Sequence, residues 1–138
     1  MIRVLVSLLF FVSGNVLGQE SASKSLLSAE VVNVRNDSGS VGFALYDEES
    51  FMKTPIQAAY IKVASGKAIV EFKDLEPGVY AILCYHDENG NNKMDFESNG
   101  MPKEDYGMST NFMGYGPPTF EQAKFNFNGE NLKLEIKF

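Results

Sequence analysis

The sequence contains little of the chemistry on which many enzymes depend: it has one cysteine, Cys84, one histidine, His86, and no tryptophan. A single cysteine excludes a disulfide within these residues, so a well-packed core or a bound ion must provide the stability that disulfides often give to exported domains. One cysteine and one histidine are also too few for a zinc site, which normally takes three or four nitrogen or sulfur ligands. We therefore interpret Cys84 as a small buried hydrophobe and His86 as a strand-end residue that orients the next loop.

Positive charge is also limited, because 12 Lys and Arg residues face 18 Asp and Glu residues and leave a formal net charge of −6. An acidic protein of this kind is not expected to bind nucleic acid or an anionic membrane surface. The same balance is compatible with the binding of a cation.

Only one long apolar run is present, and it lies at the N-terminus. Arg3, the apolar residues 4–12 and small or polar residues up to position 18 are typical of a secretory signal peptide, 1–18. The run is short of the roughly 20 residues that a membrane-spanning helix needs, which argues against the alternative of an uncleaved anchor, and no later segment approaches that length. We expect an exported protein in the periplasm, on the outer-membrane surface or in the medium. Without the signal, 138 − 18 leaves 120 residues, and without Arg3 the net charge becomes −6 − 1 = −7.

Residues 19–25 form a short polar linker, and 26–138 are long enough for one domain with a real core. Several short segments alternate apolar and polar residues with the period of two that is typical of strands, most clearly at 132–138. Residues 79–85 are apolar on both faces, which predicts a central strand. The other expected strands are 27–35, 41–46, 58–64, 69–73 and 124–128. Turn residues between them, including the turn 128–131 between two antiparallel strands, favour an antiparallel immunoglobulin-like or prealbumin-like β-sandwich of about seven strands.

Two short helical turns are expected outside the strands. One lies within 48–56 and is broken by Pro55, and one lies at 119–123 with Thr119 as its cap. Residues 87–118 show no strand pattern, and a loop of that length inside a small domain is usually functional or organised by something else.

The long loop begins with the sequence HDENGNNKMD, which places oxygen-bearing side chains at loop positions 1, 3, 5 and 9. Calcium takes six to eight oxygen ligands, and alternate side chains of a tight loop with a carbonyl near position 7 provide several of them. The loop differs from an EF-hand because it has Asn92 at position 6, Ser98 at position 12 and a strand before it. The sequence predicts a structural Ca²⁺ site formed by Asp87, Asn89, Asn91, the carbonyl of Lys93, and Asp95.

Glu97, Glu104 and Asp105 are the candidates for the remaining calcium ligands. Mg²⁺ is less favoured because it prefers rigid octahedral sites with several waters. The alternative interpretation of HDENGNNKMD is a solvated turn, because Asn, Asp and Gly favour turns for their own reasons.

The second part of the long loop is rich in aromatic residues and methionine. These residues are either a satellite core beneath the loop or the lining of a carbohydrate- or peptide-binding groove. The groove would be formed by Tyr106, Phe112, Tyr115 and Phe120.

Several separated motifs, in order, resemble a bacterial family of exported proteins catalogued as domain of unknown function 2141: FKDLEPGVYA, HDENGNNKMD, PKEDYGMS and PTFEQA. The resemblance covers residues 31–138 and implies a single exported domain from Gram-negative bacteria without a settled activity. The pattern F-x-D-L-x-P-G-x-Y is more loosely similar to prealbumin-like and collagen-adhesin B-type sandwiches. That likeness implies a fold role, not a catalytic one, for Phe72, Leu75, Pro77, Gly78 and Tyr80.

The sequence thus predicts a non-enzymatic, calcium-containing binding or envelope-structural module whose ligand or partner the sequence does not name. A ligand-binding module that uses the aromatic loop is the first alternative. An enzyme that uses Cys84 or His86 is a weaker one, because no oxyanion hole or third orienting group can be assigned.

Overall fold

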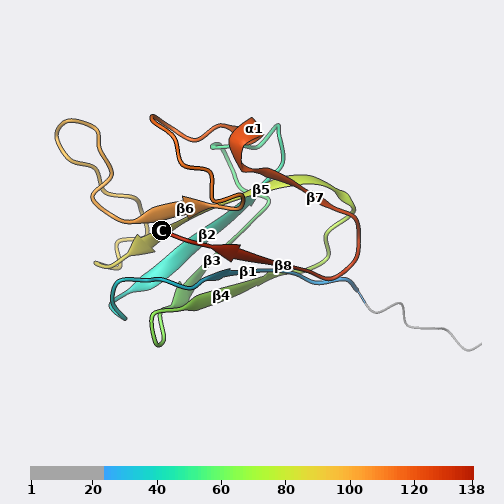
Figure 1. Ribbon diagram of the computed structural model, residues 1–138, viewed down its shortest axis with the longest axis horizontal. Helices are drawn as coiled ribbons and strands as arrows, with labels where there is room; N and C mark the ends of the chain where they lie inside the picture. Colours follow the sequence, from blue (N-terminus) through green and yellow to red (C-terminus); the bar gives the residue numbers. More distant parts are fainter. Residues whose placement is uncertain (1–23) are drawn as a thin grey trace, which may run out of the picture.

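Two β-sheets pack face to face in the computed structural model, which describes residues 24–138 (Figure 1). The smaller sheet has the order β4-β1-β8, and the larger has the order β3-β2-β5-β6, with β7 also paired to β5. This arrangement confirms the predicted all-β sandwich. The elements are β1 (Leu27–Val31), β2 (Ser40–Tyr46), β3 (Gln57–Lys62), β4 (Ala68–Phe72), β5 (Gly78–Asp87), β6 (Tyr106–Met108), α1 (Phe120–Ala123), β7 (Lys124–Phe127) and β8 (Leu132–Ile136).

Period-two alternation explains which side chains fill the space between the sheets. In β1, Leu27, Ala29 and Val31 are fully buried while the residues between them are partly exposed. Because successive side chains of a strand point to opposite faces, one face of each strand enters the core. The main core takes its largest buried side chains from both sheets, among them Phe43, Phe72 and Phe127.

Strand β5 is central, as its apolar sequence predicts. One edge pairs with β2, and the other pairs with β7 over its first half and with β6 over its second half. Ile82 and Cys84 enter the main core, whereas Ala81 and Leu83 on the opposite face contact a second cluster that includes Met108. Both faces are therefore covered, which is why no polar alternation appears in this strand.

Other details differ from the sequence-based expectation. The sandwich has eight strands rather than about seven, and β1 runs parallel to β8. The first strand ends at Val31 rather than at residue 35. The turn 128–131 does not join two paired strands, because β7 belongs to the larger sheet and β8 to the smaller one. A turn sequence shows where a chain reverses but not which sheet it enters, and here the chain crosses between sheets.

The short helix α1 begins as predicted at a Thr119 cap. The Thr119 side chain accepts a hydrogen bond from the Gln122 N–H, and the Gln122 side chain accepts one from the Thr119 N–H, which is a capping box. Residues 48–56 form turns, one of them closed by a hydrogen bond from the Lys53 N–H to the Ser50 carbonyl at 2.8 Å, and no helix.

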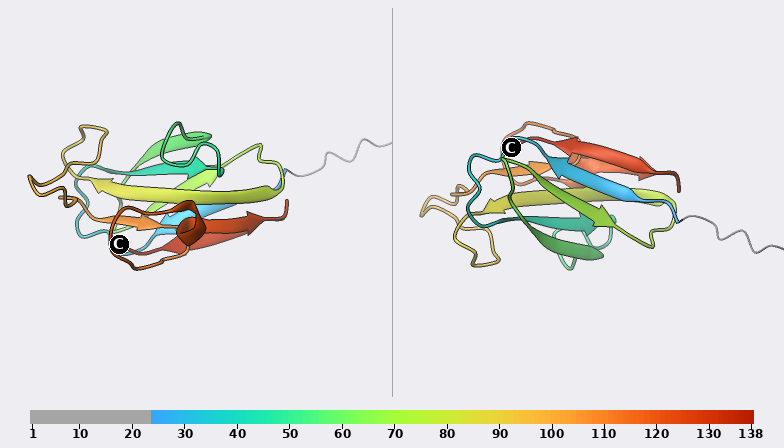
Figure 2. Two further views of the ribbon diagram at one scale, coloured as in Figure 1. Left: turned by 90° about the horizontal axis from the view of Figure 1, so that it is seen from above. Right: turned by 90° about the horizontal axis from the view of Figure 1, so that it is seen from below.

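The segment between β5 and β6 extends beyond one end of the sandwich, near the end of β8 (Figure 1), and both views in Figure 2 show it at the edge of the molecule. Strand β6, which follows this segment, was not expected from the sequence. This end of the sandwich carries the candidate site.

Candidate functional site

Asp87, the last residue of β5, lies buried at the bottom of the candidate site. Its side chain is fully buried, and its two carboxylate oxygens accept hydrogen bonds from the N–H groups of Asn91 (3.2 Å) and Asn92 (2.9 Å). Asn92 has a φ of +60°, the left-handed conformation that asparagine tolerates better than most residues. The chain therefore coils tightly around a buried carboxylate directly after the central strand.

The side chains of Asn89 and Asn91 converge on Asp95. Their amide groups donate to the Asp95 carboxylate at 2.8 to 2.9 Å. Their own oxygens accept N–H groups two residues further along, from Asn91 (3.2 Å) and Lys93 (3.1 Å). The structure thus brings Asp87, Asn89, Asn91 and Asp95 into one hydrogen-bonded turn, an arrangement that both the calcium-site and the solvated-turn interpretations predict.

Of the three candidates for further ligands, only Glu104 contacts this turn. Its Oε2 accepts the Asp95 N–H at 3.2 Å, and its Oε1 is buried without a hydrogen-bond partner among residues 24–138. Asp105 instead forms an ion pair with Arg35 at 2.9 Å, and Glu97 is exposed. Glu104 is therefore the carboxylate that returns to the start of the loop.

The two carboxyl groups that meet at this point differ in their electrostatic environment. Hydrogen bonds from Asn89 and then Asn91 hold the pKa of Asp95 below its usual value. Burial is the main reason that the pKa of Glu104 lies above its usual value, and the negative charges of Asp95 and Asp87 add to the effect. A positive charge placed between them would relieve the cost of the ionised Glu104.

Two tyrosines on the larger sheet hold the turn in place through a hydrogen bond to its main chain. The Tyr60 hydroxyl donates to the Asn92 carbonyl at 2.8 Å and lies 3.2 Å from the Tyr85 hydroxyl. A Cβ at Gly42 would come within 2.9 Å of both rings, so the glycine leaves the space they occupy. Sequence reasoning missed this support, because Tyr60 precedes Asn92 by 32 residues and only the pairing of β2 with β3 and β5 brings them together.

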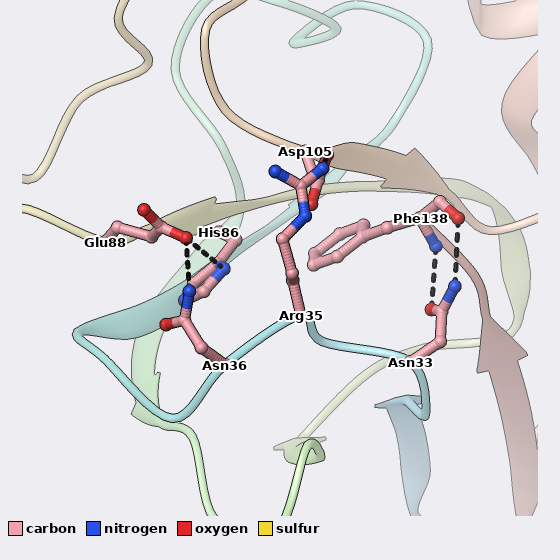
Figure 3. Close-up of polar contacts among 7 residues, drawn as sticks. All are labelled: Asn33, Arg35, Asn36, His86, Glu88, Asp105 and Phe138. Atoms are coloured by element: carbon pink, nitrogen blue, oxygen red, sulfur yellow. Dashed lines mark hydrogen bonds and ion pairs between the residues drawn. The ribbon is translucent and has the colours of Figure 1, made fainter.

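His86 is 1% exposed and packs at the end of β5, as predicted. Its Nε2–H donates to the Ser38 carbonyl at 2.7 Å, so it holds the β1–β2 connection and not the acidic turn. Its Nδ1 lies 3.7 Å from Glu88, which also accepts a hydrogen bond from Asn36 (Figure 3).

The four aromatic residues proposed for a groove do not share one surface. Tyr106 and Phe112 line a cleft of about 450 Å³ beside β6. Phe120 lies beside a different cleft and stacks edge-on with Phe51 at a centroid distance of 5.7 Å. Tyr115 is fully exposed. Phe120 thus belongs to the satellite cluster beneath the loop, while the other three rings are partly or fully open to solvent.

Two general observations limit the chemistry of the described chain. Among residues 24–138, no group of three or more His, Cys, Asp or Glu side chains is arranged to hold a metal ion. In the same residues, no helix has the length and apolar character required to cross a bilayer. The predicted signal peptide lies outside the described residues.

These features define an all-β sandwich domain with an Asx-rich turn at the end of its central strand. The chain belongs to the family described as uncharacterized protein conserved in bacteria (DUF2141), whose sequence model matches residues 29–135. The matched region includes every strand except the ends of β1 and β8. No curated protein and no solved structure matches the chain.

Proposed function

We propose that the turn after β5 binds one Ca²⁺ ion, and that the ion stabilises the loop end of an exported, non-enzymatic module with a binding or envelope-structural role. The observation that carries this proposal is the convergence of Asp87, Asn89, Asn91 and Asp95 around one turn, with Glu104 returning to it. All of these groups offer hard oxygen ligands, which Ca²⁺ prefers.

The hydrogen bonds in the turn are compatible with an ion. The oxygens of Asn89 and Asn91 each accept one main-chain N–H, and a carbonyl oxygen has a second lone pair for a cation. The ion would replace the amide N–H groups as the partner of the Asp95 carboxylate. The Lys93 carbonyl at position 7 and both oxygens of Glu104 would bring the count to the six to eight that Ca²⁺ takes. The carboxylates of Asp87, Asp95 and Glu104 would have to close on the ion, because among residues 24–138 they are not already arranged around a common centre.

The position of Glu104 in the chain is the reason that we expect a structural role for the ion. Glu104 lies two residues before Tyr106, the first residue of β6, so a cation shared by Asp87 and Glu104 links the end of β5 to the start of β6. The long segment between these two strands would then be closed at its base. A bound ion of this kind provides the stability that a chain with one cysteine does not obtain from disulfides.

The proposal of a non-enzymatic role is supported by the burial of Cys84 and His86, the two residues on which the enzymatic alternative depends. Cys84 is 3% exposed, and burial raises the pKa of its thiol, which disfavours the nucleophilic thiolate. His86 is buried and donates to a main-chain carbonyl. Export to the periplasm, the outer-membrane surface or the medium is part of the same proposal, and it is supported by the sequence of residues 1–18.

The test is calorimetric melting of the purified protein in EDTA and in excess Ca²⁺. An ion that binds only the folded state adds about 2.7 kcal/mol at a concentration of 100 times its dissociation constant. Titration calorimetry should give one site per chain, with weaker binding of Mg²⁺. Melts that superimpose in EDTA and Ca²⁺ would refute the proposal.

Variants distinguish Ca²⁺ binding at this site from a nonspecific effect of Ca²⁺ on an acidic loop. We expect Asp95→Asn and Glu104→Gln to abolish most of the Ca²⁺-dependent rise in melting temperature. Glu97→Gln is the matched control, because Glu97 is an exposed acid of the same loop outside the cluster. Its melting response to Ca²⁺ should equal that of the wild type, and an equal loss in all three variants would indicate nonspecific charge screening instead.

A further inference from the structure

Among residues 24–138, no strand pairs with the outer edge of β6. His86 N–H donates to the Asp105 carbonyl (2.8 Å) and Ser109 N–H to the Ile82 carbonyl (3.0 Å), so residues 105, 107 and 109 direct their main-chain groups toward β5. In an antiparallel pair the main-chain groups of the alternate residues point away from the partner. The N–H and C=O of Tyr106 and the N–H of Met108 therefore point outward, and among residues 24–138 they have no hydrogen-bond partner.

A cleft of about 450 Å³ runs along this edge. One wall is the loop after β6, with Phe112 46% and Met113 93% exposed. The other wall is formed by Lys137 and Phe138, the two residues that follow β8. Gly107 allows β6 to lie directly against this strand end, because a Cβ there would be 2.8 Å from the Ile136 side chain. The volume lies within the range of 300 to 1,000 Å³ typical of ligand pockets.

The chemistry of the edge favours one type of occupant. Outward N–H and C=O groups on alternate residues of a strand are matched by the main chain of another extended segment. A sugar-binding platform is less well matched, because Phe120 lies outside this cleft and Tyr115 does not line it. The exposed side chains of Phe112 and Met113 suit apolar side chains of the incoming segment.

The charge of the cleft indicates that the bound segment has an acidic group. Of the residues described by the structure, Lys137 has the only charged side chain that lines the cleft, in a chain with a net charge of −6. Its Nζ lies 3.6 Å from Glu135, and both side chains are more than half exposed, a geometry in which an ion pair is weak. Lys137 is therefore available to a carboxylate on a ligand. A second copy of the chain would add another −6, which makes a separate partner the better match.

We propose that this cleft binds an extended peptide segment of a partner protein, which adds a strand to β6, places apolar side chains against Phe112 and Met113, and directs an acidic group to Lys137. This site goes beyond the proposed calcium turn and does not require it, because no outward group of β6 belongs to that turn.

The experiment is selection of a random octapeptide display library on the purified protein. The selected peptides are then synthesised with a fluorescent label and measured by anisotropy, in EDTA and in Ca²⁺. We expect peptides with alternating apolar residues and at least one Asp or Glu. Binding in both buffers supports the cleft whether or not the calcium proposal survives, and binding in neither overturns the cleft without affecting the calcium melts.

Two substitutions at one position test strand addition. Tyr106→Pro removes an outward N–H that β5 does not use, and proline is tolerated at such edge positions. Tyr106→Ala removes the same ring but keeps the N–H. We expect at least about tenfold weaker binding by Tyr106→Pro and less than about threefold by Tyr106→Ala, where tenfold is the loss of roughly one good interaction. Equal affinities of the two variants would overturn strand addition.

A third variant and a direct measurement complete the test. Lys137→Glu should weaken the acid-bearing peptides at least about threefold, with an effect that shrinks at high salt. In the wild type, hydrogen exchange of the Tyr106 and Met108 amides should slow when peptide is bound, a result that does not depend on the folding of any variant. Unchanged exchange at both amides, self-association of the free protein in sedimentation, or displacement of peptide by glycans would each overturn the proposal.

Discussion

Gly39 and Asp87 are in direct main-chain contact: a Cβ on Gly39 would lie 2.0 Å from the Asp87 carbonyl oxygen. Gly39 also has a φ of +66°, a conformation that L side chains rarely adopt. The connection between β1 and β2 therefore packs against the first residue of the acidic turn, and His86 adds a hydrogen bond to Ser38 at the same place. The bottom of the candidate site is therefore formed by two segments that are far apart in sequence, the β1–β2 connection and the end of β5.

Gly39→Ala should consequently destabilise the protein strongly. The left-handed conformation costs about 1–2 kcal/mol for a residue with a Cβ, and overpacking against main chain adds about 1–3 kcal/mol. Gly90→Ala is the matched control, because Gly90 has a φ of +70° but open space around its Cβ position. Urea unfolding in EDTA should show a loss of only about 1–2 kcal/mol for Gly90→Ala. Equal losses in the two variants would mean that the contact with Asp87 contributes nothing.

Ser109 connects three elements at the end of β6. Its buried hydroxyl accepts the Ile82 N–H at 3.1 Å and donates to the Ala123 carbonyl. Ser109→Ala removes the hydroxyl partner of both buried main-chain groups, which should cost about 1–3 kcal/mol in urea unfolding. Thr110→Ala is the control, because Thr110 makes a similar bond to the Gln122 carbonyl in an exposed position. Its cost should stay within about 0.5 kcal/mol.

A pH-dependent contribution is expected from Asp47. Hydrogen bonding by the side chain and then the main chain of Ser50 holds the pKa of Asp47 below its ordinary value of 3.8. A folded-state pKa below the unfolded one stabilises the protein at pH above about 3.8, and the gain is lost as the pH falls through the folded value. Ser50→Ala should raise the pKa of Asp47 in a carboxyl NMR titration and reduce the loss of stability between pH 6 and pH 3. Ser98→Ala, at an exposed serine distant from Asp47 in sequence, should change neither quantity.

The sequence was sufficient to predict the layers of the fold and the turn that forms the site. The two apolar faces of residues 79–85 predict a central strand, which the structure confirms. The spacing of Asp87 and Asp95 predicts a calcium site, of which the structure shows the turn that these residues share. Both predictions depend on local patterns, which a single sequence records directly.

The rest depended on tertiary contacts. Strand β6 has only three residues, too few for an alternation pattern, and it is a strand only because β5 pairs with it. Glu97, Glu104 and Asp105 were equivalent in sequence, and the choice of Glu104 follows from the pairing of Asp105 with Arg35. The tyrosine support beneath Asn92 follows from the order of strands in the larger sheet. None of these relations has a local signal.

Cys84 offers a last prediction, which bears on the enzymatic alternative. Its thiol is buried in the main core, with Sγ 3.7 Å from the carbonyl of Gly107 on the neighbouring strand β6, and burial raises its pKa above the ordinary range. Iodoacetamide should therefore label the native protein at least roughly 100-fold more slowly than the protein in urea, since reaction requires opening of the core. Mass spectrometry of timed samples measures both rates. Rapid stoichiometric labelling of the folded protein would show an accessible, activated thiol and would revive the case for a cysteine-dependent activity.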